Sequence, residues 1–396
     1  MAQTLKFGNK VWAAKEDSVL AYNDINNNYK PLPFDFARAS IGTRVNKDGL
    51  IETMGQDIAR IDYTDSADGV LLLEPSSTNL ATLSENFSGW SNISNATVTS
   101  NYTISPEGVI NATRLQFTGN GYLFNLNSPA QVNGTQYTLS CYAKRNDSET
   151  QSFGFFSNGS TAVDNAMVLT NQWKRFYYTY TASNVLQLGL SGLSGADVSV
   201  YGFQVEQSSY STSYIATSGS TVTRAAETCN NSGNSEVFND SEGVLFADIA
   251  ANANDNTYKL TSISDGSDSN RITLGYYNTD NKLYIEVRSG GVNQTSFSYS
   301  IANSLLYSKL ALSYKLNDVT IWVNGIKGTS DTSASMPIGL SELNFNYTDS
   351  LPFYGSTKEI GYYNTALTDL ELETLTSYKS WTSMVNELNL NIIYNG

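Results

Sequence analysis

The sequence predicts an all-β protein built of two β-sandwiches, and three observations support this fold class. Short segments in which apolar and polar residues alternate recur between clusters of Gly, Asn and Ser, the pattern of strands joined by tight turns. Only 15% of the residues are charged, whereas Tyr and Gly are abundant, with 26 and 29 copies. The alternating segments also fall into two blocks, so each block predicts a sandwich of its own.

The first block runs over residues 81–216. Its strands are expected at 112–117, 137–144, 173–181 and 198–206, where every second side chain faces a core. This alternation puts Cys141 on a buried face, while Cys229 falls in a polar stretch. We therefore expect no disulfide between these two cysteines, and the pair gives no sign of an oxidising compartment.

The second block runs over residues 243–378. The segments GVLFADIA, NRITLGYYN, NKLYIEVRS, SKLALSYKL and DVTIWVNGIKG read as strands, and Asn324-Gly325 is a two-residue hairpin turn. Thr368 and Glu371 then form a capping box that predicts the start of a short helix.

The remaining segments have weaker patterns. Residues 1–80 contain turn signals and few apolar runs, which predicts a small β-rich segment with a hairpin at Asp48-Gly49. Residues 217–242 read as a linker, and the uncharged stretch 208–220 reads as a hinge between the two sandwiches. Residues 379–396 are too apolar for a free tail, so we expect them to pack on their own sandwich or on a neighbouring copy.

Three separated blocks resemble sequences of phage appendage and minor structural proteins. They are PFDFARASIGTRVNKDGLIE at 33–52, ARIDYTDSADGVLLLEPSSTNL at 59–80 and TSYIATSGSTVTRAAE at 212–227. The resemblance implies that residues 81–216 form a carbohydrate-binding-like jelly roll and that residues 243–378 form a laminin-G or concanavalin-like sandwich. It further implies that residues 1–80 attach the chain to a virion.

Composition excludes several classes of function. A formal net charge of −14 argues against nucleic acid as a partner, and no apolar run has the length of a membrane span or a signal peptide. The sequence has no histidine, so a Ser-His-Asp triad is impossible and acid–base chemistry falls to carboxylates. Asp248, Glu286 and Glu359 lie on separate strands and are interpreted as solvated carboxylates, so we assign no catalytic residue and expect no enzyme.

An aromatic set is the best candidate binding site. Alternation along three predicted strands places Tyr277, Tyr284, Trp322, Arg271 and Arg288 on the face opposite the aliphatic residues. Flat rings beside hydrogen-bonding groups suit a sugar, because its apolar CH face stacks while its hydroxyls bond. The alternative is that this face packs on the jelly roll, on the tail or on another subunit.

A calcium site is conceivable where oxygen ligands cluster at Asp265, Asp268 and Asn270. The spacing does not match an EF-hand loop, and a plain hairpin loop between two strands is the preferred interpretation. We expect no other metal and no cofactor.

These inferences predict a non-enzymatic structural protein of a phage virion, a fibre, spike or related appendage displayed on the particle. Its partners would be other virion proteins and a host-surface glycan, and symmetry favours a homo-oligomer, with a trimer as the first expectation. One alternative is a secreted bacterial polysaccharide-processing enzyme or its binding module. Another is a decoration protein without a ligand, because sandwiches serve all three roles.

Overall fold

The computed structural model describes residues 4–8, 11–15, 17–20, 32–90, 92–124, 131–147, 152–157, 164–183, 187–347 and 351–390. Within them the regular secondary structure is almost entirely β-strand, with two short α-helices and one 3-10 helix, so the predicted all-β class is confirmed. Neither α-helix in the described part of the chain has the length and apolarity to cross a membrane.

The chain divides into two compact units, each assembled from separate stretches of sequence. Unit 1 contains Met1–Arg38, Gln56–Pro75 and Ala226–Gly396, and unit 2 contains Ala39–Gly55 and Ser76–Ala225. The chain therefore changes unit after residues 38, 55, 75 and 225.

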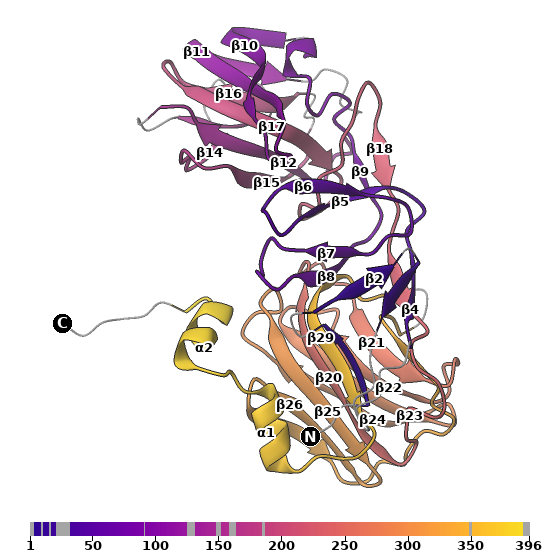
Figure 1. The fold of residues 1–396 in the computed structure, drawn as a ribbon. Helices are drawn as coiled ribbons and strands as arrows, with labels where there is room; N and C mark the ends of the chain where they lie inside the picture. The colour runs from indigo at the N-terminus through magenta and orange to yellow at the C-terminus, as the bar shows by residue number, and fades with distance from the viewer. Residues whose placement is uncertain are drawn as a thin grey trace, which may run out of the picture. The chain divides into compact units, whose positions relative to one another are not determined.

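Unit 1 is a sandwich of two large sheets with a smaller third sheet, and Figure 1 shows the strands of all three. The eight-stranded sheet has the order β27-β26-β25-β20-β29-β8-β7, with β1 pairing β29, and the five-stranded sheet has the order β24-β23-β22-β21-β28. A four-stranded sheet adds β19-β4-β3-β2. The bounds are β1 (Leu5–Gly8), β2 (Ala13–Lys15), β3 (Ser18–Leu20), β4 (Phe34–Ala37), β7 (Arg60–Asp62), β8 (Val70–Leu73), β19 (Thr228–Asn230), β20 (Glu242–Ala251), β21 (Lys259–Ser264), β22 (Arg271–Tyr276), β23 (Lys282–Ser289), β24 (Val292–Ser300), β25 (Ser308–Lys315), β26 (Asp318–Val323), β27 (Ile326–Asp331), β28 (Glu342–Asn344) and β29 (Gly355–Tyr363).

One continuous core joins the two large sheets of unit 1. Leu245 and Leu312 from the eight-stranded sheet and Ile272 and Ile285 from the five-stranded sheet are fully buried in the same apolar cluster. Each strand contributes alternate residues to it, as the sequence pattern predicts. The predicted Asn324-Gly325 turn also closes β26 against β27, because both residues adopt the positive φ that a two-residue hairpin requires.

Unit 2 carries one eight-stranded sheet around its own core. The strand order is β14-β13-β16-β11-β17-β12-β15, with β10 pairing β11, and two small ladders, β18-β9 and β5-β6, lie outside it. Cys141 and Leu139 of β12 and Val200 of β17 are buried in this core, which confirms that these side chains face inward as predicted. The bounds are β5 (Gly42–Val45), β6 (Ile51–Met54), β9 (Ser77–Asn79), η1 (Phe87–Gly89), β10 (Asn92–Ile104), β11 (Ile110–Phe124), β12 (Gln136–Arg145), β13 (Phe153–Ser157), β14 (Asp164–Ala166), β15 (Lys174–Thr181), β16 (Leu188–Gly192), β17 (Asp197–Glu206) and β18 (Val222–Arg224).

The segmentation expected for residues 1–80 differs from the structure. Strands β1, β7 and β8 belong to the eight-stranded sheet of unit 1, whereas the hairpin β5–β6, predicted around Asp48-Gly49, belongs to unit 2. Residues 1–80 are thus shared between the units instead of forming a segment of their own, because β1 and β8 pair with β29 and β4 pairs with β19, while β9 pairs with β18 of unit 2. Attachment of this segment to a virion stays a prediction.

The linker and hinge expected at 217–242 and 208–220 are also structured. Gln204 Oε1 accepts a hydrogen bond from the backbone N–H of Ile215 at 2.7 Å, and Thr217 N donates to Ser84 Oγ at 2.8 Å, so this stretch packs within unit 2. Beyond it, β18 pairs with β9 and β19 pairs with β4. Cys229 on β19 is consequently buried, not solvated, and both cysteines are free thiols.

The blocks that carry the phage resemblance meet at one buried ion cluster in unit 1. Glu227 Oε1 accepts hydrogen bonds from Arg38 Nη1 and Arg60 Nε, each at 2.7 Å, and Arg60 Nη2 lies 2.8 Å from Glu74 Oε2. Arg38, Arg60 and Glu227 are at most 1% exposed. Each of the three blocks therefore supplies a charge to a single buried site.

The C-terminal part of unit 1 forms the helices α1 (Asp369–Thr376) and α2 (Trp381–Glu387). The predicted capping box is confirmed, because Thr368 Oγ1 accepts from Glu371 N while the Glu371 carboxylate accepts from Thr368 N. Helix α1 packs on β25 and β26. In the predicted apolar tail, Val385 of α2 is buried, and residues 391–396 lie outside the described residues.

Replacing Thr368 by alanine is expected to lower the free energy of unfolding of unit 1 by about 1 kcal/mol, the usual cost of losing a helix N-cap. Urea unfolding followed by tryptophan fluorescence measures it. Thr374→Ala on the same helix is the control, because the Thr374 hydroxyl bonds the Leu370 carbonyl and caps nothing. Equal losses in both variants would contradict the prediction.

Candidate functional site

The outer face of the five-stranded sheet brings together four of the five predicted binding residues. Strand β22 pairs with β23 so that Arg271 lies opposite Arg288. Thr273 and Glu286 occupy the next outward positions, and Tyr284 and, just beyond β22, Tyr277 follow them. The residues that alternate with them along β22 and β23, such as Ile272 and Ile285, face the core. The sequence pattern therefore placed these four side chains correctly relative to the aliphatic core.

Trp322 does not belong to this face, which corrects the prediction. It lies on β26 of the eight-stranded sheet, where it is 5% exposed and packs with Phe246, Tyr363 and Leu372 beneath α1. A sandwich has two outer faces, and alternation along a strand does not say which one a residue occupies. Helix α1 covers this one, so Trp322 is a packing residue.

Three tyrosines form a cluster at one end of the face, which we call the tyrosine face. Tyr258 lies 5.1 Å from Tyr277 and 5.5 Å from Tyr284 between ring centroids, both in edge-on contact, and Tyr277 lies 5.7 Å from Tyr284. All three side chains are partly exposed. Burial, together with a hydrogen bond to Tyr277, raises the pKa of Tyr258 to about 12, so its hydroxyl stays protonated and can donate at neutral pH.

The two arginines hold Tyr347 at the other end of the face. Arg288 Nη1 donates to the Tyr347 hydroxyl at 3.0 Å, and the guanidinium carbon of Arg271 lies 4.0 Å from the centre of the Tyr347 ring. Arg271 also donates to Asp268 Oδ1 at 2.8 Å. The arginines thus orient an aromatic side chain, and Arg271 itself is only 3% exposed.

Polar atoms without partners lie between the two ends of this face. Thr273 Oγ1 and Glu286 Oε2 are buried and make no hydrogen bond within the described part of the chain. Burial raises the pKa of Glu286, and Tyr347, Arg288 and Arg271 offset that effect only in part. Glu286 was interpreted as a solvated carboxylate, but it is 1% exposed because the outer side chains close over it.

A groove adjoins Tyr347 and is lined mainly by side chains that donate and accept hydrogen bonds without a net charge. Its volume is about 460 Å³, within the range of about 300–1,000 Å³ that small ligands occupy. We call it the amide groove, because Asn230, Asn231, Asn344 and Asn346 line it together with Ser264, Ser267, Asp268, Arg271, Glu342 and Tyr347. Asn230 Oδ1 is buried there without a partner among the described residues.

The calcium candidates are engaged within their own loop. Asp265 Oδ1 accepts from Ser267 N at 2.9 Å, and Asp265 Oδ2 accepts from Asn270 Nδ2 at 2.8 Å. The loop joins β21 to β22, which pair antiparallel as a hairpin. Among the residues that the structure describes, no three His, Cys, Asp or Glu side chains are grouped to hold a metal ion.

Sequence reasoning missed Tyr258, Tyr347 and the amide groove. Tyr258 could have been predicted, because it directly precedes β21 and lies an even number of residues before the outward residues Ser262 and Ser264, which places it on the same face. Tyr347 lies three residues after the end of β28, but its position over Arg271 depends on contacts between residues more than 70 positions apart. The groove gave no signal, because asparagine is common throughout this sequence.

No protein-family model and no curated protein matches the chain. Solved structures with some similarity include the CBM40 of Ruminococcus gnavus IT-sialidase bound to alpha2,3 sialyllactose, with 17% identity over 38% of this chain and 94% of that one and a TM-score of 0.32. Domain 4 of AbnA, an extracellular arabinanase from Geobacillus stearothermophilus in complex with arabinotriose, has 17% identity over 38% of this chain and 73% of that one, with a TM-score of 0.32. At these values neither fold nor ligand is transferred to this chain.

Proposed function

We propose that the chain is a non-enzymatic, glycan-binding structural protein of a phage particle, and that the outer face of the five-stranded sheet is its binding surface. Two features of this surface carry the glycan assignment. One is the amide groove beside Tyr347, and the other is the tyrosine face at the opposite end. Rings there offer stacking surface, and asparagine side chains offer donors and acceptors for hydroxyl groups. A sugar needs both.

A buried polar atom in the amide groove supports the same assignment. Asn230 Oδ1 lacks a partner within the described residues, and an unmade hydrogen bond at a buried atom costs about 1–3 kcal/mol. A ligand rich in hydroxyl groups would satisfy this atom. The phage assignment rests on the three resembling blocks, which supply the charges of one buried cluster in unit 1.

Many copies on a particle would make weak sites sufficient, because avidity multiplies the affinity of single sites. An antibody against the chain that labels particles in electron micrographs tests the location, together with the number of copies per particle. If the protein is instead found secreted and free of particles, the bacterial alternative replaces the proposal.

Replacing Tyr284 or Tyr277 by alanine is expected to weaken glycan binding about tenfold, because a stacked ring contributes about 1–1.5 kcal/mol. A glycan array on the whole protein identifies the ligand, and calorimetry then measures the dissociation constants. Tyr177→Ala is the matched control, because Tyr177 is a 72% exposed tyrosine of unit 2. Undiminished binding by folded Tyr284→Ala rejects the face, and an array without any binder favours the decoration protein.

A further inference from the structure

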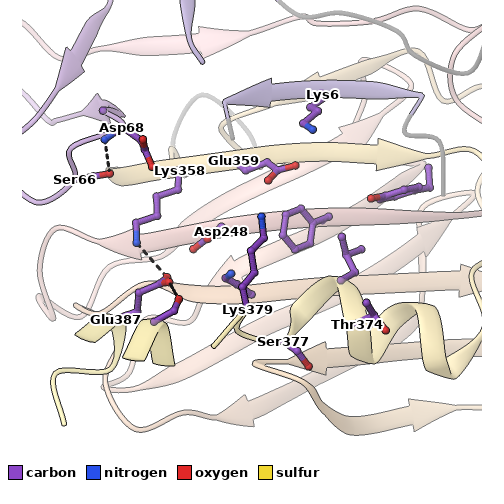
Figure 2. A pocket seen from close by; sticks show the side chains of 16 residues that line it. Lys6, Ser66, Asp68, Asp248, Lys358, Glu359, Thr374, Ser377, Lys379 and Glu387 are labelled. Atoms are coloured by element: carbon purple, nitrogen blue, oxygen red, sulfur yellow. Dashed lines mark hydrogen bonds and ion pairs between the residues drawn. The ribbon is translucent and has the colours of Figure 1, made fainter. Parts of the chain in front are cut away.

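A second pocket lies on the other large sheet, between the outer face of β20 and β29 and the helices α1 and α2 (Figure 2). Its volume is about 520 Å³, which also suits a small ligand. We call it the lysine pocket, because Lys6, Lys309, Lys358 and Lys379 line it. It shares no residue with the tyrosine face or the amide groove.

Asp248 forms part of the wall of the lysine pocket and has an unsatisfied oxygen. The sequence interpretation as a solvated carboxylate is wrong, since Asp248 is only 7% exposed. Its Oδ1 is buried and has no hydrogen-bond partner in the described part of the chain. Burial raises the pKa of this carboxyl to about 6, although Lys358 and Lys309 lower it. A buried carboxylate oxygen of this kind is costly unless a ligand supplies a donor.

The ammonium groups around Asp248 are only partly neutralised. Lys358 Nζ lies 3.2 Å from Glu387 Oε2, the ion pair drawn in Figure 2, and 4.0 Å from the centre of the Tyr307 ring. Lys309 lies 5.2 Å from the ring of Tyr378, and Lys379 is exposed; neither makes an ion pair with a residue that the structure describes. Four lysines and four carboxylates, those of Asp68, Asp248, Glu359 and Glu387, line the pocket, so Lys309 and Lys379 are the ammonium groups left for an anionic ligand.

Apolar atoms complete the pocket. Phe246 of β20, Tyr363 of β29 and Leu375 of α1 line it beside the charged groups. A ligand that fits must therefore carry an anionic group for Lys309 and Lys379, a donor for Asp248 Oδ1 and an apolar surface. Inorganic phosphate has no apolar surface, and a neutral sugar leaves Lys309 and Lys379 unused.

We propose that the lysine pocket binds a carboxylate-bearing sugar, with its carboxylate at Lys309 and Lys379, a hydroxyl group donating to Asp248 Oδ1 and its CH face against Phe246. This second site is independent of the tyrosine face. It gives the chain a specificity for acidic saccharides that its overall negative charge would otherwise oppose, because Lys309 and Lys379 have no ion-pair partner among the described residues.

Calorimetry on the full chain tests this proposal with methyl β-D-glucuronide, methyl α-D-galacturonide and N-acetylneuraminic acid as probes. Methyl β-D-glucoside, methyl α-D-galactoside and the methyl ester of N-acetylneuraminic acid are the respective neutral counterparts. At least one acidic probe is expected to bind, and its neutral counterpart is expected to bind at least tenfold more weakly. Absence of binding by all three acids, or equal binding of an acid and its neutral counterpart, overturns the proposal.

Variants locate the site. Lys309→Met, Lys379→Met and Asp248→Asn are each expected to weaken binding of the acidic probe at least tenfold, and Lys379 is exposed, so its replacement leaves the fold intact. Lys282→Met on β23 and Tyr284→Ala on the tyrosine face are expected to leave it unchanged. Binding that is unaffected by Lys379→Met and Lys309→Met, or lost in Tyr284→Ala, overturns the assignment. Release of methanol from a methyl glycoside would show catalysis and also overturn it.

Discussion

Replacing Glu227 by glutamine is expected to destabilise unit 1 by about 3–5 kcal/mol, the usual cost of removing one partner from a buried ion pair. Glu227 accepts hydrogen bonds from Arg38, Arg60 and the backbone N–H of Glu74. Burial alone would lower the pKa of Arg60, but the charges of Glu227 and Glu74 raise it, so Arg60 remains charged. Without the Glu227 carboxylate, the buried guanidinium of Arg38 loses this ion pair, and Arg60 keeps its ion pair with Glu74.

The two free cysteines allow this effect to be located. Cys229 is buried in unit 1 and Cys141 in unit 2, so thiol labelling in increasing urea, read by mass spectrometry of the labelled peptides, reports each unit separately. In Glu227→Gln, Cys229 should become reactive at lower urea. Glu242→Gln is the matched control, because Glu242 forms an exposed 3.8 Å ion pair with Lys315 in the same unit, and such pairs contribute at most about 1 kcal/mol. Equal shifts in these two variants would contradict the prediction.

Asp248 should make unit 1 less stable as the pH rises. Its folded-state pKa of about 6 exceeds the ordinary value of 3.8, and burial is the largest cause. The folded protein therefore binds this proton more tightly than the unfolded chain does. The contribution of this group to stability is fully present below pH 3.8 and is lost as the pH rises through 6, a change of about 2–3 kcal/mol.

Calorimetric unfolding of the wild type and of Asp248→Asn at pH 4, 5, 6 and 7 measures this contribution. Asparagine cannot ionise, so its stability relative to the wild type should increase by about 2–3 kcal/mol between pH 4 and pH 7. The other titrating groups are common to both proteins and cancel in the difference. A difference that stays constant over this range would show that Asp248 has a partner in solution. A destabilising carboxylate retained at a pocket is typical of a functional site.

The sequence predicted what depends on local pattern. Alternation along the chain gave the inward and outward directions of β22 and β23, Asn324-Gly325 gave a hairpin, and Thr368 with Glu371 gave the start of α1. Each of these features is determined within about ten residues, because strand parity, turn geometry and helix capping are short-range effects.

The rest depends on pairing between distant residues. Nothing near Trp322 indicates that α1 covers it, and nothing near Asp248 indicates that α2 and β29 enclose it. In the same way, the ion cluster of Arg38, Arg60 and Glu227 combines residues that are up to 189 positions apart. A single sequence contains these residues but not their contacts.

The pairing of β1 with β29 affects how the protein is made. Leu5 lies opposite Tyr362, so roughly 350 residues must leave the ribosome before the first strand meets its partner. At translation rates of about 5–20 residues per second this takes roughly 20–70 s. The last strand of unit 2 ends at Arg224, so all of unit 2 has been synthesised well before β29 of unit 1. During the interval the unpaired apolar β1 segment is exposed to solvent, where it would be a natural binding site for a chaperone.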